Sequence, residues 1–117
     1  ADIIAGFPTE TEEMFYNTYK LLKECKISHL HIFPFSPKEN TPAARMPQLQ
    51  KSIIKQRAQE LRQLGEELLD EVKKDFYLPR KVLIEEVKTG AVVGYDQNYI
   101  KHRIPMIGLP IGEIVTA

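Results

Sequence analysis

Residues 3–35 predict a strand, a helix and a second strand, and this order limits the possible folds more than any other feature of the chain. Residues 3–7 form a short apolar run that reads as a strand buried on both faces. Residues 27–35 predict the next strand, joined to the first in parallel through a right-handed helical crossover. Two strands and one helix cannot cover such a sheet, so its other neighbours must come from a longer protein or from a second copy of the chain.

The helix between these strands is predicted to begin near Thr9, because Thr9 and Glu12 fit a capping box. Its expected buried stripe comprises Met14, Thr18, Leu21, Leu22 and Cys25. A long helix is predicted over residues 49–75, and Gly65 on its buried stripe indicates close packing. The rest of that stripe comprises Ile54, Ala58, Leu61, Leu68 and Val72.

From Arg80 onward, short strands alternate with turn residues. Strands are predicted over residues 81–87, 91–95, 99–104 and 111–116. This spacing is typical of a small antiparallel barrel, so we expect two domains, residues 1–78 and residues 79–117, with Leu78 and Pro79 ending the long helix.

Composition excludes several classes of protein. The 16 basic and 16 acidic residues balance, so a nucleic-acid site would have to be a local patch. No apolar run is long enough to cross a bilayer, and no secretory leader opens the sequence. Cys25 is the one cysteine, which excludes an internal disulfide or a cluster built from this chain's thiolates and favours a cytoplasmic setting. His29 and His31 share a strand face but lack a third ligand, so we expect no metal site.

Three stretches could carry function, and each has a plain structural alternative. Gly6 could let the backbone approach a ligand, or only form a tight strand-to-helix turn. The proline-rich loop of residues 36–47 could contact a substrate, or be a rigid connector. A later hairpin could stack on bases and pair with phosphates, or be a solvated strand face. Its side chains of interest are Tyr95, Tyr99, Lys101, His102 and Arg103.

These stretches, in this order, resemble the methylthiotransferase branch of the radical S-adenosylmethionine (SAM) enzymes. Residues 2–11 (DIIAGFPTET) resemble a stretch on a late strand of that family's barrel, with Thr9 in place of the usual glycine. Residues 28–47 (SHLHIFPFSPKENTPAARMP) resemble the members that act on threonylcarbamoyladenosine in tRNA, although residues 38–40 differ from the usual pattern. Residues 94–100 and 111–115 resemble the TRAM domain, a small barrel taken to bind tRNA.

The resemblance implies an α/β fold: the C-terminal part of a radical SAM (β/α) partial barrel over residues 1–78, followed by a TRAM-like antiparallel β-barrel. It implies SAM and two 4Fe-4S clusters in the parent enzyme, none held by this chain, and addition of a methylthio group to C2 of the modified adenosine 37. The resemblance also implies three sets of site residues. Those near SAM would be Gly6, Phe7 and Glu10, and those lining the barrel mouth would be Phe33, Phe35 and Ser36. The tRNA anticodon stem-loop would be contacted by Tyr95, Tyr99, Lys101 and Arg103.

The expected protein is therefore an inactive piece of such an enzyme, whose partners are tRNA and the rest of the parent. The alternative is a stand-alone RNA-binding module in which residues 80–117 bind and the α/β part is a scaffold. A Cys-x3-Cys-x2-Cys motif upstream in the gene would select the enzyme. A third possibility is a different barrel enzyme that shares only the strand–glycine–helix turn. Because a truncated sheet has unpaired edges, we expect the isolated chain to self-associate.

Overall fold

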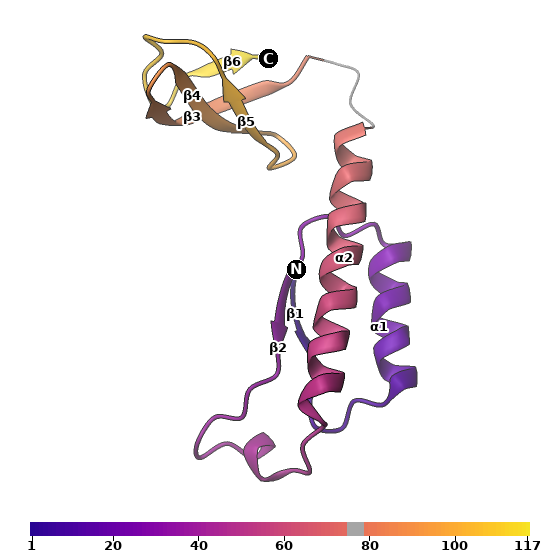
Figure 1. Ribbon diagram of the computed structural model, residues 1–117. Coiled ribbons are helices and arrows are strands. Elements are labelled where there is room, and N and C mark those ends of the chain that lie inside the picture. Colours follow the sequence, from indigo (N-terminus) through magenta and orange to yellow (C-terminus); the bar gives the residue numbers. More distant parts are fainter. Residues whose placement is uncertain (75–78) are drawn as a thin grey trace. The chain divides into compact units, whose positions relative to one another are not determined.

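The computed structural model describes residues 1–74 and 79–117, which form two compact units, Ala1–Val72 and Lys73–Ala117 (Figure 1). The chain is α/β, with a two-stranded parallel sheet in the first unit and a four-stranded antiparallel sheet in the second. The predicted end of the long helix and the predicted domain boundary fall at residues 75–78, outside the described residues.

The first unit contains β1 (Asp2–Ala5), α1 (Glu12–Glu24), β2 (His31–Pro34), a 3-10 turn (Ala43–Arg45) and α2 (Lys51–Lys74). The strands β1 and β2 pair in parallel, with Ile3 opposite Ile32, which confirms the strand–helix–strand prediction. Both strands are shorter than predicted. Gly6 ends β1, because its φ of +81° leaves the extended region.

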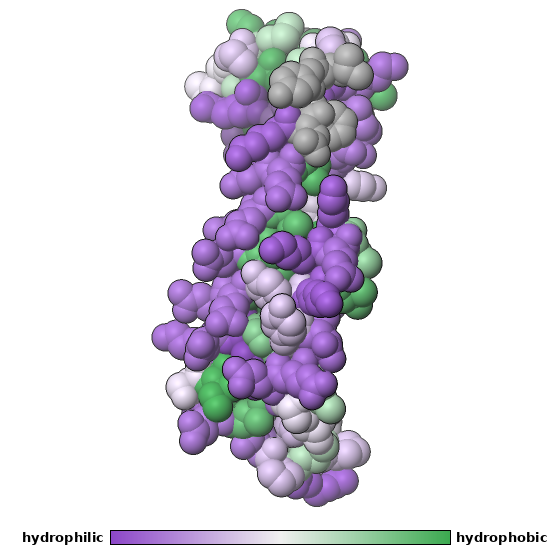
Figure 2. Space-filling view, turned by 90° about the vertical axis from the view of Figure 1, so that its right-hand side faces the viewer, coloured by the Kyte–Doolittle hydropathy of each residue, from purple (hydrophilic) through white to green (hydrophobic). Residues whose placement is uncertain are grey.

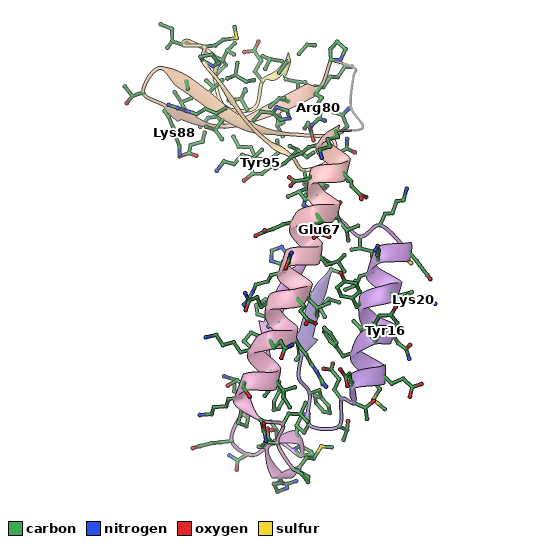
Figure 3. The ribbon with its side chains drawn as sticks, turned by 45° about the vertical axis from the view of Figure 1, so that its right-hand side comes forward. Tyr16, Lys20, Glu67, Arg80, Lys88 and Tyr95 are labelled. Atoms are coloured by element: carbon green, nitrogen blue, oxygen red, sulfur yellow. The ribbon has the colours of Figure 1, made fainter. Side chains whose placement is uncertain are left out.

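The predicted start of α1 was wrong, and of its predicted buried stripe Leu22 is confirmed as buried. The helix is capped by Thr11, whose Oγ1 accepts from the Met14 N–H at 3.2 Å, and not by Thr9. Phe15 and Leu22 face the core, whereas Met14, Leu21 and Cys25 of the predicted stripe are exposed. The opposite side of α1 is exposed to solvent. Tyr16 and Lys20 project outward from it (Figure 3), and hydrophilic side chains cover most of this face (Figure 2).

The helix α2 supplies most of the core of the first unit. Ile54, Ala58, Leu61 and Leu68 are buried as predicted, and Leu64, which the prediction omitted, joins them. Gly65 also packs closely as predicted: a Cβ there would lie 3.3 Å from the Leu30 Cβ. The two helices and the inward residues of both strands form one cluster, comprising Ala5, Phe15, Leu22, Ile32, Ala58, Leu61, Leu64 and Leu68.

The residues of this chain bury the first strand on one face only, and the prediction that other neighbours cover its second face stays a prediction. Ile3 and Ala5 point to the helices, but Ile4 points the other way and is 57% exposed. Its partner across the sheet is Phe33, which is 51% exposed. Within the described residues the sheet is therefore covered on one face and open on the other.

The second unit contains β3 (Lys81–Lys88), β4 (Ala91–Asp96), β5 (Lys101–Ile104) and β6 (Ile114–Thr116). All pairings are antiparallel, in the order β5-β4-β3-β6, with a bulge in β3 between Ile84 and Glu86. Val82, Ile84 and Val92 form the core on one face of the sheet, against which Ile104, Leu109 and Val115 pack. The last two strands begin later than predicted, because Tyr99 and Gly112 have left-handed φ values of 58° and 93°.

Candidate nucleic-acid interface

The face of the four-stranded sheet opposite the core carries one row of side chains across all four strands. Ile114 pairs with Leu83, Leu83 with Tyr95, and Tyr95 with Lys101. Directly paired residues in antiparallel strands point to the same face, so these four side chains lie side by side. We call these four residues the transverse row. Ile114 and Leu83 are 63% and 41% exposed, which is unusual for large aliphatic side chains in neighbouring strands.

Cations and a second tyrosine border the transverse row. Arg103 lies two residues from Lys101 on the same face of β5, and Lys81 lies two residues from Leu83 on β3. Tyr99, in the turn between β4 and β5, is 76% exposed. A hollow of about 380 Å³ is lined by Lys81, Leu83, Glu85, Tyr95, Asp96, Gln97, Tyr99 and Ile114. Aromatic rings beside cations can stack on unpaired bases while the cations pair with phosphates.

The turn that presents Tyr99 is built around the buried carboxylate of Asp96. Asp96 Oδ1 accepts from the backbone N–H of Asn98 at 2.8 Å and of Ile100 at 3.1 Å. Its Oδ2 accepts from Arg80 Nη1 at 3.0 Å and lies 2.9 Å from His102 Nε2. The Asp96 side chain is fully buried, so this network fixes the backbone of the turn from the core side of the sheet.

Burial raises the pKa of Asp96, but the hydrogen bonds from His102, from the backbone N–H groups and from Arg80 outweigh it and lower the pKa from 3.8 to about 2. A carboxylate whose pKa is lower in the folded state stabilises the fold above the unfolded pKa. We therefore expect this contribution, about 2 kcal/mol, to be present above about pH 4 and lost as the pH falls to about 2. Urea unfolding of the second unit at several pH values measures it, and an Asp96→Asn variant should lack this part of the pH dependence.

The end of β1 is occupied by contacts within the chain. Gly6 donates its N–H to Glu10 Oε1 at 3.2 Å, and Arg57 Nη1 lies 2.9 Å from the same oxygen. A Cβ on Gly6 would lie 2.6 Å from Ile54 Cγ1, so the glycine is needed for packing against α2. These contacts favour the tight-turn alternative for Gly6. Of the three residues that the resemblance placed near SAM, Phe7 has a side chain accessible to a ligand, since it is 41% exposed.

The residues predicted at the barrel mouth gather at the end of β2. Phe35 packs edge-on against Phe7, with ring centroids 5.4 Å apart. Phe33 points to the open face of the sheet, and Ser36 is exposed. A hollow of about 440 Å³ lies beside them, lined also by Ile4 and Lys38. The structure thus brings Phe7, Phe35 and their neighbours together, as expected for the carboxyl ends of parallel strands.

Comparison with known proteins identifies the family. No family model matches the chain. The chain is 45% identical, over all 117 residues, to threonylcarbamoyladenosine tRNA methylthiotransferase MtaB of Rickettsia prowazekii, and 38% identical over 98% of its length to the Bacillus subtilis protein of that name. It is 39% identical over 80% of its length to the tRNA-2-methylthio-N(6)-dimethylallyladenosine synthase of Aquifex aeolicus. The chain belongs to the tRNA methylthiotransferase family. It spans 27% of the first two of these methylthiotransferases and 22% of the third.

The described residues of this chain do not fit an iron–sulfur cluster, which takes three or four thiolates. Cys25 is exposed at the end of α1, and no group of three or more potential metal ligands occurs in residues 1–74 and 79–117. Within these residues, neither His29 nor His31 belongs to such a group. No described helix is long and apolar enough to span a membrane.

Of the predicted hairpin residues, the structure places Tyr95, Lys101 and Arg103 on one face, with Tyr99 beside them. His102 points to the other face and contacts Asp96. Sequence reasoning missed the other members of the interface, Leu83, Ile114 and Lys81. Their exposure follows from strand register, for which the sequence offers no local signal.

Proposed function

We propose that this chain is part of a tRNA methylthiotransferase and that its four-stranded sheet binds the anticodon stem-loop of the tRNA substrate. The observation that carries the proposal is the transverse row, an exposed apolar and aromatic strip that ends in Lys101. We assign the sheet to the TRAM-like domain of such an enzyme, and the first unit to the end of its radical SAM barrel. The parent enzyme would hold SAM and its clusters through residues outside this chain.

RNA affinity tests the assignment of the sheet. Lys101→Ala/Arg103→Ala should weaken binding of an anticodon stem-loop RNA about tenfold at low salt, because two phosphate partners are lost. The slope of log affinity against log salt should fall by roughly 0.7–0.9 for each cation. Fluorescence anisotropy over a salt series measures both quantities.

A matched control and a second variant separate charge from stacking. Lys20→Ala/Lys23→Ala removes two exposed cations from α1 and should leave affinity unchanged. Tyr99→Ala should cost about 1–3 kcal/mol of binding free energy, as expected for one stacked base, without changing the salt slope. If Lys101→Ala/Arg103→Ala and Lys20→Ala/Lys23→Ala bind the RNA with equal affinity, the sheet is ruled out as the RNA site.

The enzymatic part of the proposal needs a different test. A longer protein that contains this chain should be reconstituted anaerobically with iron and sulfide. It should then be incubated with SAM, a one-electron reductant such as dithionite, and tRNA that carries threonylcarbamoyladenosine without a methylthio group. Mass analysis of the tRNA nucleosides should then detect the methylthio product. Absence of product from a protein that carries intact clusters would leave RNA binding as the function of this chain.

A further inference from the structure

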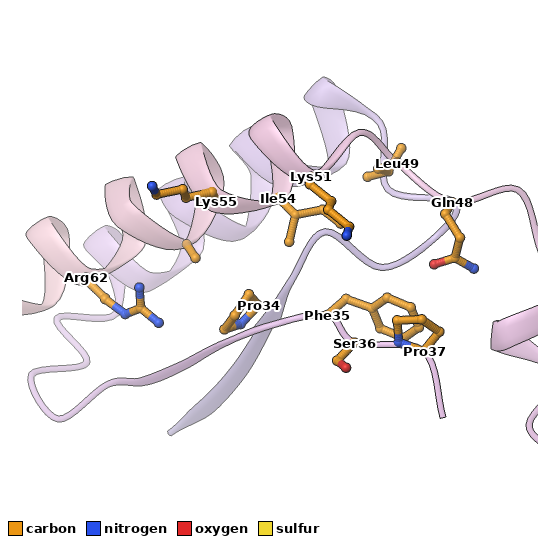
Figure 4. Close-up of a pocket in the computed structure, with 11 residues that line it drawn as sticks. Pro34, Phe35, Ser36, Pro37, Gln48, Leu49, Lys51, Ile54, Lys55 and Arg62 are labelled. Carbon is orange, nitrogen blue, oxygen red and sulfur yellow. The ribbon is translucent and has the colours of Figure 1, made fainter. Parts of the chain in front are cut away.

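A cleft of about 500 Å³ lies in the first unit, between the N-terminal half of α2 and the segment that follows β2 (Figure 4). Its walls are mostly apolar and include Pro34, Phe35, Ile54 and Ala58. Three cations also line it, namely Lys51, Lys55 and Arg62, whereas no carboxylate of the described residues does. In Figure 4 the Lys51 ammonium points toward the segment that follows β2, the Arg62 guanidinium points toward β2, and the Lys55 side chain runs along α2.

The three cations form a stripe along α2. They are spaced i, i+4 and i+11, which places them on one side of the helix. At 1.5 Å per residue the stripe is about 16 Å long. That length exceeds a single phosphate or carboxylate, so it matches a ligand with several negative charges in a line.

The charges at the N-terminal end of α2 oppose the helix dipole, whereas Lys73 and Lys74 in its last turn suit it. Its residues 51–62 carry four cations and one carboxylate, and its first turn contains no acidic residue. Its residues 63–72 carry four carboxylates and no cation. Cations near a helix N-terminus are unfavourable by about 0.3–1 kcal/mol each. Helix stability therefore does not account for Lys51 and Lys55, and binding of an anion would.

We propose that this cleft binds the phosphodiester backbone of RNA, as a contact separate from the four-stranded sheet. The inference extends the proposed function, since it names a second surface of the chain that contacts tRNA. RNA is favoured over an acidic protein segment because Phe35, Pro34 and Pro37 offer flat apolar surfaces on which sugars and bases can rest. The apolar walls also strengthen the attraction between the cations and phosphates.

The test replaces two lysines without altering the packing. Lys51→Gln/Lys55→Gln removes both charges but keeps an unbranched polar side chain and the helix propensity, and both positions are exposed. The affinity of the 117-residue chain for an anticodon stem-loop RNA should fall about tenfold at low salt, with a shallower salt slope. Lys51→Arg/Lys55→Arg should restore binding. Arg62 is left unchanged, because its Nη2 also donates to the Ile32 carbonyl at 3.3 Å.

Controls decide what a negative result means. Lys20→Gln/Lys23→Gln on α1 should bind as the unaltered chain does, and circular dichroism should show that all variants keep their helices. The proposal is overturned if the cleft variant matches this control. It is also overturned if poly-glutamate, at equal total charge, displaces RNA from the unaltered chain but not from the cleft variant.

The cleft and the sheet can fail independently. If Lys101→Ala/Arg103→Ala weakens binding and the cleft variant does not, the sheet assignment stands and the cleft is rejected. If only the cleft variant weakens binding, the cleft stands and the sheet assignment is rejected. If the unaltered chain binds no RNA, both are rejected. Inorganic phosphate that displaces RNA at matched ionic strength would indicate a single-anion site and would also reject the cleft proposal.

Discussion

Replacing Asp96 with alanine is expected to lower the free energy of unfolding of the second unit by about 3–5 kcal/mol. The carboxylate is fully buried and accepts from Arg80 Nη1 at 3.0 Å, so its removal takes away one acceptor of a nearly buried guanidinium and the negative charge beside it. It also removes the acceptor for the N–H groups of Asn98 and Ile100. Amide resonances of β3 and β4, followed through a urea titration, report on this unit alone.

The matched control is Glu113→Ala, which removes an exposed carboxylate from the same unit. It should change the free energy of unfolding by less than about 0.5 kcal/mol. The loss of unfolding free energy for Asp96→Asn should lie between those of Asp96→Ala and Glu113→Ala, because an amide oxygen can still accept from the N–H groups of the turn but carries no charge. If Asp96→Ala unfolds at the same urea concentration as Glu113→Ala, the network does not stabilise the sheet.

Gly94→Ala is expected to destabilise the second unit by more than about 3 kcal/mol, the upper part of the range for overpacking. A Cβ at this position would lie 2.0 Å from the Leu83 carbonyl oxygen, which belongs to the backbone of the neighbouring strand and cannot rotate away. The strands β3 and β4 would have to separate at the centre of the sheet. Thermal unfolding followed by circular dichroism should show loss of the strand signal before that of α2.

Gly90→Ala separates crowding from backbone strain. Gly90 has a φ of +71°, and a Cβ there would have no atom within 4 Å. The Gly90→Ala variant should therefore lose only about 1–2 kcal/mol of unfolding free energy, the cost of holding an alanine in the left-handed conformation. Equal losses for the two glycine variants would show that the close approach at Gly94 is relieved by a small shift of the strands.

Local patterns predicted the helices better than their boundaries. The 3.6-residue period of α2 identified four of its buried residues, because one side of a long helix repeats the same signal several times. The start of α1 was misplaced because Thr9 and Thr11 both precede acidic residues, and only the structure shows which hydroxyl accepts from the helix backbone. Its buried face then shifted, so that Phe15 and not Met14 points inward.

The candidate interface was predictable along a strand but not across strands. The period of two in β5 places Lys101 and Arg103 together and His102 on the opposite face, and that signal was present in the sequence. The pairing of Leu83 with Tyr95 and Ile114 depends on the register of three strands and could not be read locally. The contact of Arg80 with Asp96 joins residues 16 positions apart for the same reason.

The network around Asp96 has a consequence for how this surface can diversify. Its hydrogen bonds to the turn end on main-chain N–H groups, at Asn98 and Ile100, and none of them depends on which side chains occupy the tip. Gln97, which is exposed, could therefore be exchanged while the loop keeps its shape, whereas Tyr99 could be replaced only by residues that tolerate its φ of 58°. If the sheet binds RNA as proposed, a library randomised at Gln97 would sample new base preferences on an unchanged frame.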